Sequence, residues 1–321
     1  MLHYETQNSL ANEISECRQA ILGYRSGKLI KADYSVEYSV YGDEELKKVL
    51  VLGGISADRH IVNSIDRKGW WQPLSEQGQC LDVDEYCLIG IDYWAPEESS
   101  NVSTKIHADI IEALRHELKF EKFEAIIGCS YGGLVAQSYA ACYPKNLEQL
   151  IVVCAAGENS NKAVAIRDIQ RKIIALDPTS KETLAIARSL ALIGYRGEEE
   201  LENKFSKAQT VENAKLDTEF INYLEKKSKQ FVKHFSSERY HKLSLSLDLH
   251  EDVSHKINAP TLFIAFQSDQ LVPISLVRKT AKQIKAKVSV DIIETHYGHD
   301  AFLIEWEKIN ESIKEFLRNK K

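Results

Sequence analysis

The stretch "IIGCSYGG" (residues 126–133) carries the strongest structural signal in this chain of 321 residues. An apolar run leads into the spacing G-x-S-x-G, and a helical pattern follows it. A strand that enters a helix through such a sharp turn holds a nucleophilic side chain in a strained backbone position. Glycine is needed two residues before and two residues after that side chain, because larger residues would collide with the turn. The stretch therefore predicts a nucleophile elbow.

Two side chains in this elbow could attack a carbonyl group, those of Cys129 and Ser130. Ser130 has a glycine at both required positions, whereas Cys129 has glycines one residue before and three residues after it. The spacing predicts that Ser130 is the nucleophile and that Cys129 packs as a small hydrophobic residue. The plain alternative is a glycine-rich turn without chemistry, but the flanking strand and helix favour the elbow.

Short apolar runs alternate with amphipathic stretches along most of the chain. We interpret residues 47–54, 86–93, 123–130, 147–156, 259–269 and 287–295 as strands. Helical spacing covers residues 103–119, 132–143 and 274–286, and the alternating residues 29–43 fit an edge hairpin. This rhythm is typical of an α/β fold with a mostly parallel central sheet and helices on both faces.

The alternation of strands and helices stops between residues 158 and 256. This region has no clear strand, and helical patterns cover residues 161–176, 181–194 and 218–235. Helices inserted between strands in this way predict a cap over one end of the sheet. We therefore expect a core made of residues 1–157 and 257–321, with a helical cap made of residues 158–256.

Composition excludes several classes of function. The formal net charge is −6, without a basic stripe for nucleic acid or a polybasic cluster for a membrane surface. The polar N-terminus lacks the features of a signal peptide, and no apolar run is long enough to span a membrane. The six cysteines form no CxxC pair, so we expect reduced thiols, no metal site and a cytoplasmic location. A few local donors would still suffice to bind a polyanion such as a CoA ester.

A serine nucleophile needs a base and an orienting carboxylate, which follow it along the chain in the order acid, then histidine. Asp269 closes one predicted strand and His299 lies just beyond the next, so both belong at the edge of the sheet where the elbow emerges. We predict that these two residues complete a catalytic triad with Ser130. His296 is the competing base. Asp92 is the competing acid, although it precedes the serine.

An oxyanion that forms during attack needs backbone N–H donors. One donor should be the N–H of Tyr131, directly after the nucleophile. The second should come from the loop "LGGISADRH" (residues 52–60), where we favour Ile55 over Gly54. Glycines in this loop allow the backbone to approach a substrate closely.

These motifs resemble the homoserine O-acyltransferase family, which has the α/β-hydrolase fold and includes acetyl and succinyl transferases. The resemblance runs from about residue 51 to 305. The elbow "GCSYGGLVAQSYAACYP", the cap stretches "RDIQRKI", "ARSLALIGYR" and "RYHKLSLSLDLH", and the motifs "APTLFIAFQSDQLVP" and "YGHDAFL" carry it. The last motif is the most specific, since few hydrolases place Asp-Ala-Phe-Leu after the catalytic histidine.

The resemblance implies that Arg188 and Tyr195 reach from the cap to an amino-acid substrate and that Asp300 meets its ammonium group. An amino acid presents a carboxylate and an ammonium, so it requires one fixed cation and one fixed anion. Arg188 offers a bidentate fork and shares a helix face with Tyr195, seven residues on. Alternatively, Arg188 is a solvated helix charge; Arg167 and Arg196 are weaker candidates.

The resemblance also implies an acyl-CoA cosubstrate without a permanently bound cofactor, a ping-pong reaction, a homodimer formed through the cap and a place in methionine biosynthesis. Tyr131 and "GGISADRH" look more like the succinyl-transferring branch. We therefore expect L-homoserine as the acceptor, with succinyl slightly favoured over acetyl. Serine as the acceptor stays open, because some relatives in that branch use it.

Two other functions compete with acyl transfer. A carboxylester hydrolase or thioesterase would use the same triad but would not need a carboxylate clamp in the cap. A non-catalytic binding protein of this fold would usually lack one member of the triad, and here none is missing.

Overall fold

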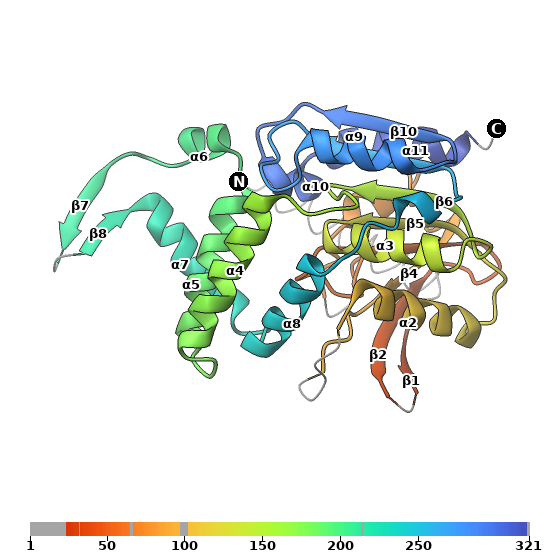
Figure 1. Cartoon of the computed structure of the whole chain (residues 1–321), viewed down its shortest axis with the longest axis horizontal. Coiled ribbons are helices and arrows are strands. Elements are labelled where there is room, and N and C mark those ends of the chain that lie inside the picture. The colour runs from red at the N-terminus through yellow and green to blue at the C-terminus, as the bar shows by residue number, and fades with distance from the viewer. Residues whose placement is uncertain (1–23, 32, 65–66, 97–101, 213–214, 320–321) are drawn as a thin grey trace, which may run out of the picture.

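A single eight-stranded sheet organises the protein (Figure 1). The computed structural model describes residues 24–31, 33–64, 67–96, 102–212 and 215–319. The strands in chain order are β1 (Arg25–Ile30), β2 (Ser35–Tyr41), β3 (Lys47–Leu52), β4 (Tyr86–Ile91), β5 (Phe123–Cys129), β6 (Leu147–Val153), β9 (Thr261–Phe266) and β10 (Val288–Ile293). Their order in the sheet is β1-β2-β4-β3-β5-β6-β9-β10. All six strands predicted from apolar runs are therefore present, together with the edge hairpin β1–β2.

Six neighbouring strands from β4 to β10 run parallel, and β2 is antiparallel to both of its neighbours, β1 and β4. Parallel strands direct their carboxyl ends to one edge, so the loops that follow β3, β5, β9 and β10 meet there. Ligand sites of open α/β sheets form at this edge. The predicted site residues at strand ends are thereby brought within reach of one another.

Two hydrophobic clusters lie on opposite faces of the sheet, as the alternation of side chains along a strand requires. Leu50 and Leu52 belong to the cluster under α2 (Thr104–Glu117), α3 (Tyr131–Cys142) and α9 (Ile274–Gln283). Val49 and Val51 belong to the cluster under α11 (Trp306–Arg318). The α/β-hydrolase arrangement, with helices on both faces, is therefore confirmed, although α11 was not predicted.

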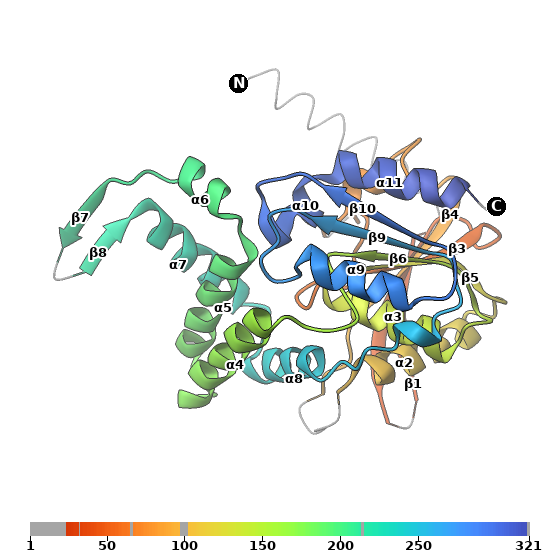
Figure 2. The same cartoon turned by 45° about the horizontal axis from the view of Figure 1, so that its top comes forward.

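The cap elements lie between β6 and β9 in sequence and beside the sheet in space (Figures 1 and 2). They are α4 (Asn161–Leu176), α5 (Lys181–Tyr195), α6 (Glu198–Lys204), β7 (Gln209–Glu212), β8 (Lys215–Thr218), α7 (Glu219–Phe231) and α8 (Ser237–Asp248). Serine or threonine side chains cap the amino ends of α4, α5, α7 and α8. The exact cap boundaries at residues 158 and 256 stay a prediction.

The expectation that the cap contains no strand is wrong. β7 and β8 pair in an antiparallel hairpin, with Val211 opposite Leu216. Each strand has only four residues, and Val211 is 73% exposed. Because the hairpin lacks a buried face, its sequence has no long apolar alternation from which it could be predicted.

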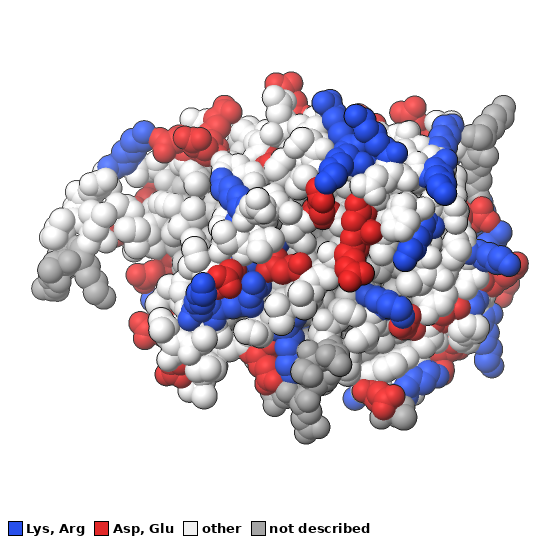
Figure 3. All heavy atoms as spheres, in the orientation of Figure 1, with Lys and Arg blue, Asp and Glu red and all other residues white. Residues whose placement is uncertain are grey.

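On the face shown in Figure 3, acidic and basic side chains lie interspersed. Among the residues that the structure describes, no helix is both long enough and apolar enough to cross a lipid bilayer. Cys17, and with it the whole N-terminal segment to residue 23, lies outside the described residues.

Candidate active site

Ser130 occupies the turn between β5 and α3 with φ 53° and ψ −116°. The flanking glycines are required by steric contact. A Cβ on Gly128 would lie 2.2 Å from the carbonyl oxygen of Gly132, and one on Gly132 would lie 2.4 Å from that of Leu52. Both distances are shorter than any normal contact. The backbone therefore has the geometry that G-x-S-x-G predicts, with Ser130 in the strained position.

Cys129 is fully buried in the cluster beneath the elbow. Burial raises the pKa of its thiol well above the ordinary value, so the thiol stays protonated. The prediction that Cys129 is a packed hydrophobic residue is confirmed.

Ser130, His299 and Asp269 form one hydrogen-bonded line. Asp269 follows β9, and His299 lies in the turn Gly298–Asp300 after β10. The distance from His299 Nε2 to Ser130 Oγ is 2.9 Å, and that from His299 Nδ1 to Asp269 Oδ2 is 2.7 Å. The carboxylate requires Nδ1 to donate, so Nε2 accepts from the serine hydroxyl. This is the arrangement of a nucleophile, a general base and an orienting acid.

Backbone groups hold the acid in place. Oδ1 of Asp269 accepts hydrogen bonds from the backbone N–H of Leu271 at 2.8 Å and from that of Val272 at 3.0 Å. The other oxygen, Oδ2, is thereby directed to His299. The side chains of Asp269 and His299 are 1% and 7% exposed, so water competes little for their hydrogen bond.

The environment of His299 favours its protonated form. Burial by itself lowers the pKa of His299, and the charge and hydrogen bond of Asp269 oppose that effect. Asp300 acts in the same direction as Asp269, and the pKa is raised above its ordinary value. A histidine with a raised pKa takes up a serine proton more readily, as a general base must.

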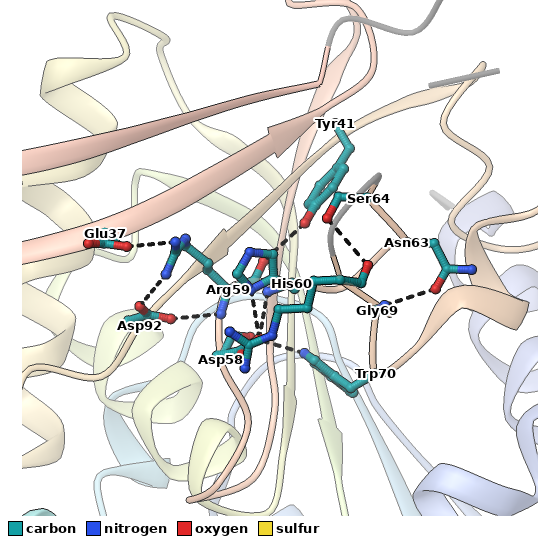
Figure 4. Close-up of polar contacts among 11 residues, drawn as sticks. Glu37, Tyr41, Asp58, Arg59, His60, Asn63, Ser64, Gly69, Trp70 and Asp92 are labelled. Atoms are coloured by element: carbon teal, nitrogen blue, oxygen red, sulfur yellow. Dashed lines mark hydrogen bonds and ion pairs between the residues drawn. The ribbon is translucent and has the colours of Figure 1, made fainter. Parts of the chain in front are cut away.

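The structure brings neither competing residue to Ser130. Asp92 accepts one hydrogen bond from the backbone N–H of Arg59 at 2.8 Å and another from Nη1 of Arg59, also at 2.8 Å (Figure 4). Glu37 lies 2.6 Å from Nη2 of the same arginine. The ring of His296 instead packs against Tyr297, with centroids 4.1 Å apart.

The loop after β3 passes directly beside Ser130. A Cβ on Gly54 would lie 3.8 Å from the Cβ of Ser130. Among the described residues, the backbone N–H groups of Ile55 and Tyr131 have no hydrogen-bond acceptor. Both predicted donors are therefore unpaired near Ser130, where an oxyanion could use them.

Several hydrogen bonds fix the course of this loop. The pairing of Arg59 with Asp92 anchors its far end, and the indole N–H of Trp70 donates to the carbonyl of Asp58 at 3.1 Å (Figure 4). At its start, the hydroxyl of Tyr93 donates to the carbonyl of Gly53 at 2.6 Å. Asp92 thus lies in a network that positions the loop.

The side chain of Tyr131 is fully buried and belongs to a series of hydrogen-bonded polar side chains. Its hydroxyl lies 2.9 Å from Nδ1 of His107 and 2.7 Å from Oγ of Ser246. Nε2 of His107 must donate to the carbonyl of Trp94 at 2.9 Å, and burial lowers the pKa of His107 to about 4. Its Nδ1 is therefore an acceptor, so Tyr131 donates to His107 and accepts from Ser246.

A cavity of about 50 Å³ lies between the core and the cap. Ser130, His299 and Ile55 line it from the core, and Tyr195 and Arg167 line it from the cap. The ring of Tyr195 lies 5.8 Å from that of His299. Such a volume has room for a few water molecules or a short acyl group.

Of the three predicted substrate residues, only Tyr195 lines this cavity. The guanidinium of Arg188 packs over Phe231 at 4.6 Å and Tyr195 at 5.4 Å, and its buried Nη1 has no hydrogen-bond partner among the described residues. Asp300 lies 3.2 Å from Nε of Arg196. Burial raises the pKa of Asp300, although Arg196, His299 and Arg188 oppose that effect.

Sequence reasoning missed several residues that line the cavity. Tyr240 reaches it from α8, and its hydroxyl donates to Oε1 of Gln170 at 2.6 Å. Asn159 and Leu247 also line it. No local motif marks these positions, because their role depends on how the cap helices pack over the elbow.

The fold and the line from Ser130 to Asp269 define the class of protein. Residues 48–305 match the family model described as the alpha/beta hydrolase fold. The chain belongs to this fold family and, within it, to the homoserine O-acyltransferases. It is 30% identical over 290 residues to a homoserine O-succinyltransferase of Xanthomonas campestris pv. campestris, covering 88% of this chain and 79% of the relative.

The chain is also similar to two homoserine O-acetyltransferases, one by sequence and one by fold. A homoserine O-acetyltransferase of Methanobrevibacter ruminantium is 26% identical over 347 residues, covering 91% of this chain and 70% of the relative. The crystal structure of homoserine O-acetyltransferase from Bacillus anthracis superposes with a TM-score of 0.84 at 19% identity, covering 92% of this chain and 98% of the other. At that identity, the superposition supports the fold alone.

Proposed function

We propose that this protein is an acyl-CoA-dependent O-acyltransferase that acylates the hydroxyl of L-homoserine, with succinyl slightly favoured over acetyl. The observation that carries the proposal is the hydrogen-bonded line from Ser130 through His299 to Asp269, together with the adjoining cavity that cap residues line. Membership in the homoserine O-acyltransferase family supports the acceptor. The 30% identical relative, named a succinyltransferase, supports the acyl group.

In the first half of the reaction, Ser130 attacks the thioester carbonyl while His299 takes the hydroxyl proton. Asp269 stabilises the imidazolium ion, and the N–H groups of Ile55 and Tyr131 stabilise the oxyanion. The carbon–sulfur bond then breaks, the CoA thiolate takes the proton from His299, and an acyl-Ser130 ester remains.

In the second half, the amino-acid hydroxyl attacks this ester and gives its proton to His299. The ester bond to Ser130 breaks, and the serine oxygen recovers the proton. Water must not replace the amino acid here. A small cavity between the cap and the core would disfavour hydrolysis by limiting the water near the ester.

We infer that Arg188 binds the carboxylate of the amino acid, with Tyr195 beside it. The unpartnered Nη1 of Arg188 supports this role, since a buried donor without a partner is costly unless a ligand uses it. Asp300 would meet the ammonium group. It already pairs with Arg196, so the substrate would have to share or displace that cation.

We also propose a homodimer formed through the cap. Ile169, Leu176, Ile186 and Ile193 on α4 and α5 are between 45% and 82% exposed. A group of exposed aliphatic side chains on neighbouring helices is suited to protein contact. No cofactor is needed for the proposed chemistry. A cytoplasmic enzyme of methionine biosynthesis would find both substrates in its own compartment.

The test is a thiol-release assay that crosses acetyl-CoA and succinyl-CoA with homoserine and serine. The expected result is rapid release that depends on homoserine and is greater with succinyl-CoA. Dependence on serine instead would reassign the acceptor. Full release without any amino acid would favour a thioesterase, and the absence of release with both donors would contradict acyl-CoA chemistry.

A further inference from the structure

Arg167 places a cation in the lining of the cavity that Ser130 faces. It lies in α4 and lines the same cavity as Ser130 and His299, with a side chain only 13% exposed. Its Nε donates to Oδ1 of Asp248 at 2.7 Å, and its Nη2 donates to Oδ1 of Asn159 at 2.9 Å. Its Nη1 makes no hydrogen bond with any residue that the structure describes. Nη1 of Arg167 can therefore donate a hydrogen bond to a ligand.

The cluster around Arg167 carries an uncompensated positive charge. Asp248, 7% exposed, is shared by Arg167 and Arg171, whose Nη1 lies 2.6 Å from its Oδ2. Asp168 lies 3.9 Å from Arg171, but Lys172 at 2.7 Å offsets it. Two guanidinium groups thus share one buried carboxylate.

The one acidic side chain of the cavity lining does not neutralise this charge. Glu158 pairs with Lys279 on the outer side, at 2.6 Å. An excess charge of one sign in a poorly hydrated site favours a ligand group of the opposite sign. The rest of the lining is largely aliphatic; it includes Ile55, Leu134, Ala155, Ala163, Leu247 and Leu271. The cavity therefore suits a short apolar chain that ends in an anion.

We propose that Arg167 binds the terminal carboxylate of an acyl group derived from a dicarboxylic acid, and so selects the acyl donor. This inference rests on the proposed acyl transfer through Ser130. The acyl chain on Ser130 occupies the cavity that Arg167 lines. A monocarboxylic acyl group such as acetyl has no group to accept from Arg167.

The experiment measures the first half-reaction alone, in single turnover without any amino acid. Succinyl-CoA and acetyl-CoA are compared, so that contacts to the shared CoA cancel in the ratio. In Arg167→Gln, the ratio of the acylation rates with succinyl-CoA and acetyl-CoA should fall by about ten- to a hundred-fold. In Arg167→Lys, which keeps a cation for Asp248, the ratio should fall less. Labelling of Ser130 by a fluorophosphonate confirms that each variant is folded.

Lys162→Gln is the matched control. It removes one positive charge from the same helix, but Lys162 is exposed and does not line the cavity, so the ratio should stay within about two-fold of the wild type. Equal losses with both donors in Arg167→Gln, or an equal change in the control, would overturn the role of Arg167. If neither donor acylates the wild-type protein, the proposed acyl transfer fails instead. Because no amino acid is present, an effect on the ratio cannot come from its carboxylate.

Discussion

The hydroxyl of Tyr131 lies 2.7 Å from Oγ of Ser246, which joins the nucleophile elbow to α8 of the cap. The same residue offers its backbone N–H next to Ser130. One residue thus connects the position of the cap with the geometry of the proposed oxyanion site. Its side chain does not line the cavity, so any influence of Tyr131 on the acyl group must be indirect.

Tyr131→Phe should destabilise the protein while leaving the oxyanion donor in place. Nδ1 of His107 and the hydroxyl of Ser246 lose a buried partner, which typically costs about 1–3 kcal/mol. Urea unfolding measures this loss. Ser246→Ala removes only one hydrogen bond and should cost less. A Tyr131→Phe protein that is as stable as the wild type would contradict a stabilising role of these buried hydrogen bonds.

Ser130→Ala should reduce acyl transfer by a factor on the order of 10⁴ or more, because both half-reactions pass through its oxygen. Cys129→Ala should retain a sizeable fraction of the activity, since the thiol is buried and protonated. Steady-state thiol release measures both variants, with urea unfolding to confirm their folds. Comparable loss in a folded Cys129→Ala protein would contradict the assignment of the nucleophile.

The activity should decline on the acidic side with a midpoint above pH 6.5. His299 must be neutral to accept a proton, and its pKa is raised from 6.5 by Asp269 and Asp300. Activity is therefore present above this raised pKa and is lost as pH falls through it. The pH profile of kcat/KM for the acyl donor measures the midpoint.

Asp300→Asn should move that acidic midpoint to a lower pH, since the negative charge of Asp300 helps to raise the pKa of His299. Asp291→Asn, on β10, is a matched removal of one carboxylate elsewhere in the chain and should leave the midpoint in place. An unchanged midpoint in Asp300→Asn would exclude an electrostatic role of Asp300 towards His299.

Asp92→Asn should reduce kcat more than it changes KM. It weakens the anchor of Arg59 and lets the loop that holds Ile55 move, so the oxyanion loses part of its stabilisation. We expect a loss of about ten-fold in kcat. Glu37→Gln, which removes the other partner of Arg59, should have a smaller effect. A change confined to stability would show that the network does not position the loop for catalysis.

Arg188→Ala should impair use of the amino acid far more than acylation of the enzyme. A lost charged hydrogen bond corresponds to about ten- to a hundred-fold in kcat/KM for homoserine. Burst kinetics separates the two half-reactions. Lys181→Ala, an exposed position on the same helix, is the control. Equal damage to both steps would contradict the proposed clamp.

Much of the fold was predictable because its signals are local. The strands from β3 to β10 that form the parallel sheet are short apolar runs between helical stretches, and they fall where expected. The β7–β8 hairpin was missed because its pairing buries no apolar face. α11 was missed although Ile309, Ile313 and Leu317 recur at helical spacing and pack on the sheet.

The preference for Ser130 over Cys129 as the nucleophile follows from the local sequence. A side chain at position 128 would clash with the backbone of Gly132. The two positions are close in the sequence, so the need for glycine can be deduced from their spacing. The order of strands also placed Asp269 and His299 at the same edge of the sheet. These conclusions depend on backbone sterics and on the direction of neighbouring strands, both of which the local sequence encodes.

Which side chains meet depends on the packing of elements that lie far apart in the sequence. This packing joined His299 rather than His296 to Ser130, gave Asp92 to Arg59 and paired Asp300 with Arg196. It also tied Tyr131 to Ser246, 115 residues away, and brought Arg167 to the cavity. Such contacts depend on how the cap packs over the sheet. A difference of a few ångströms in that packing decides whether a charge faces a substrate or another side chain, and no local pattern records it.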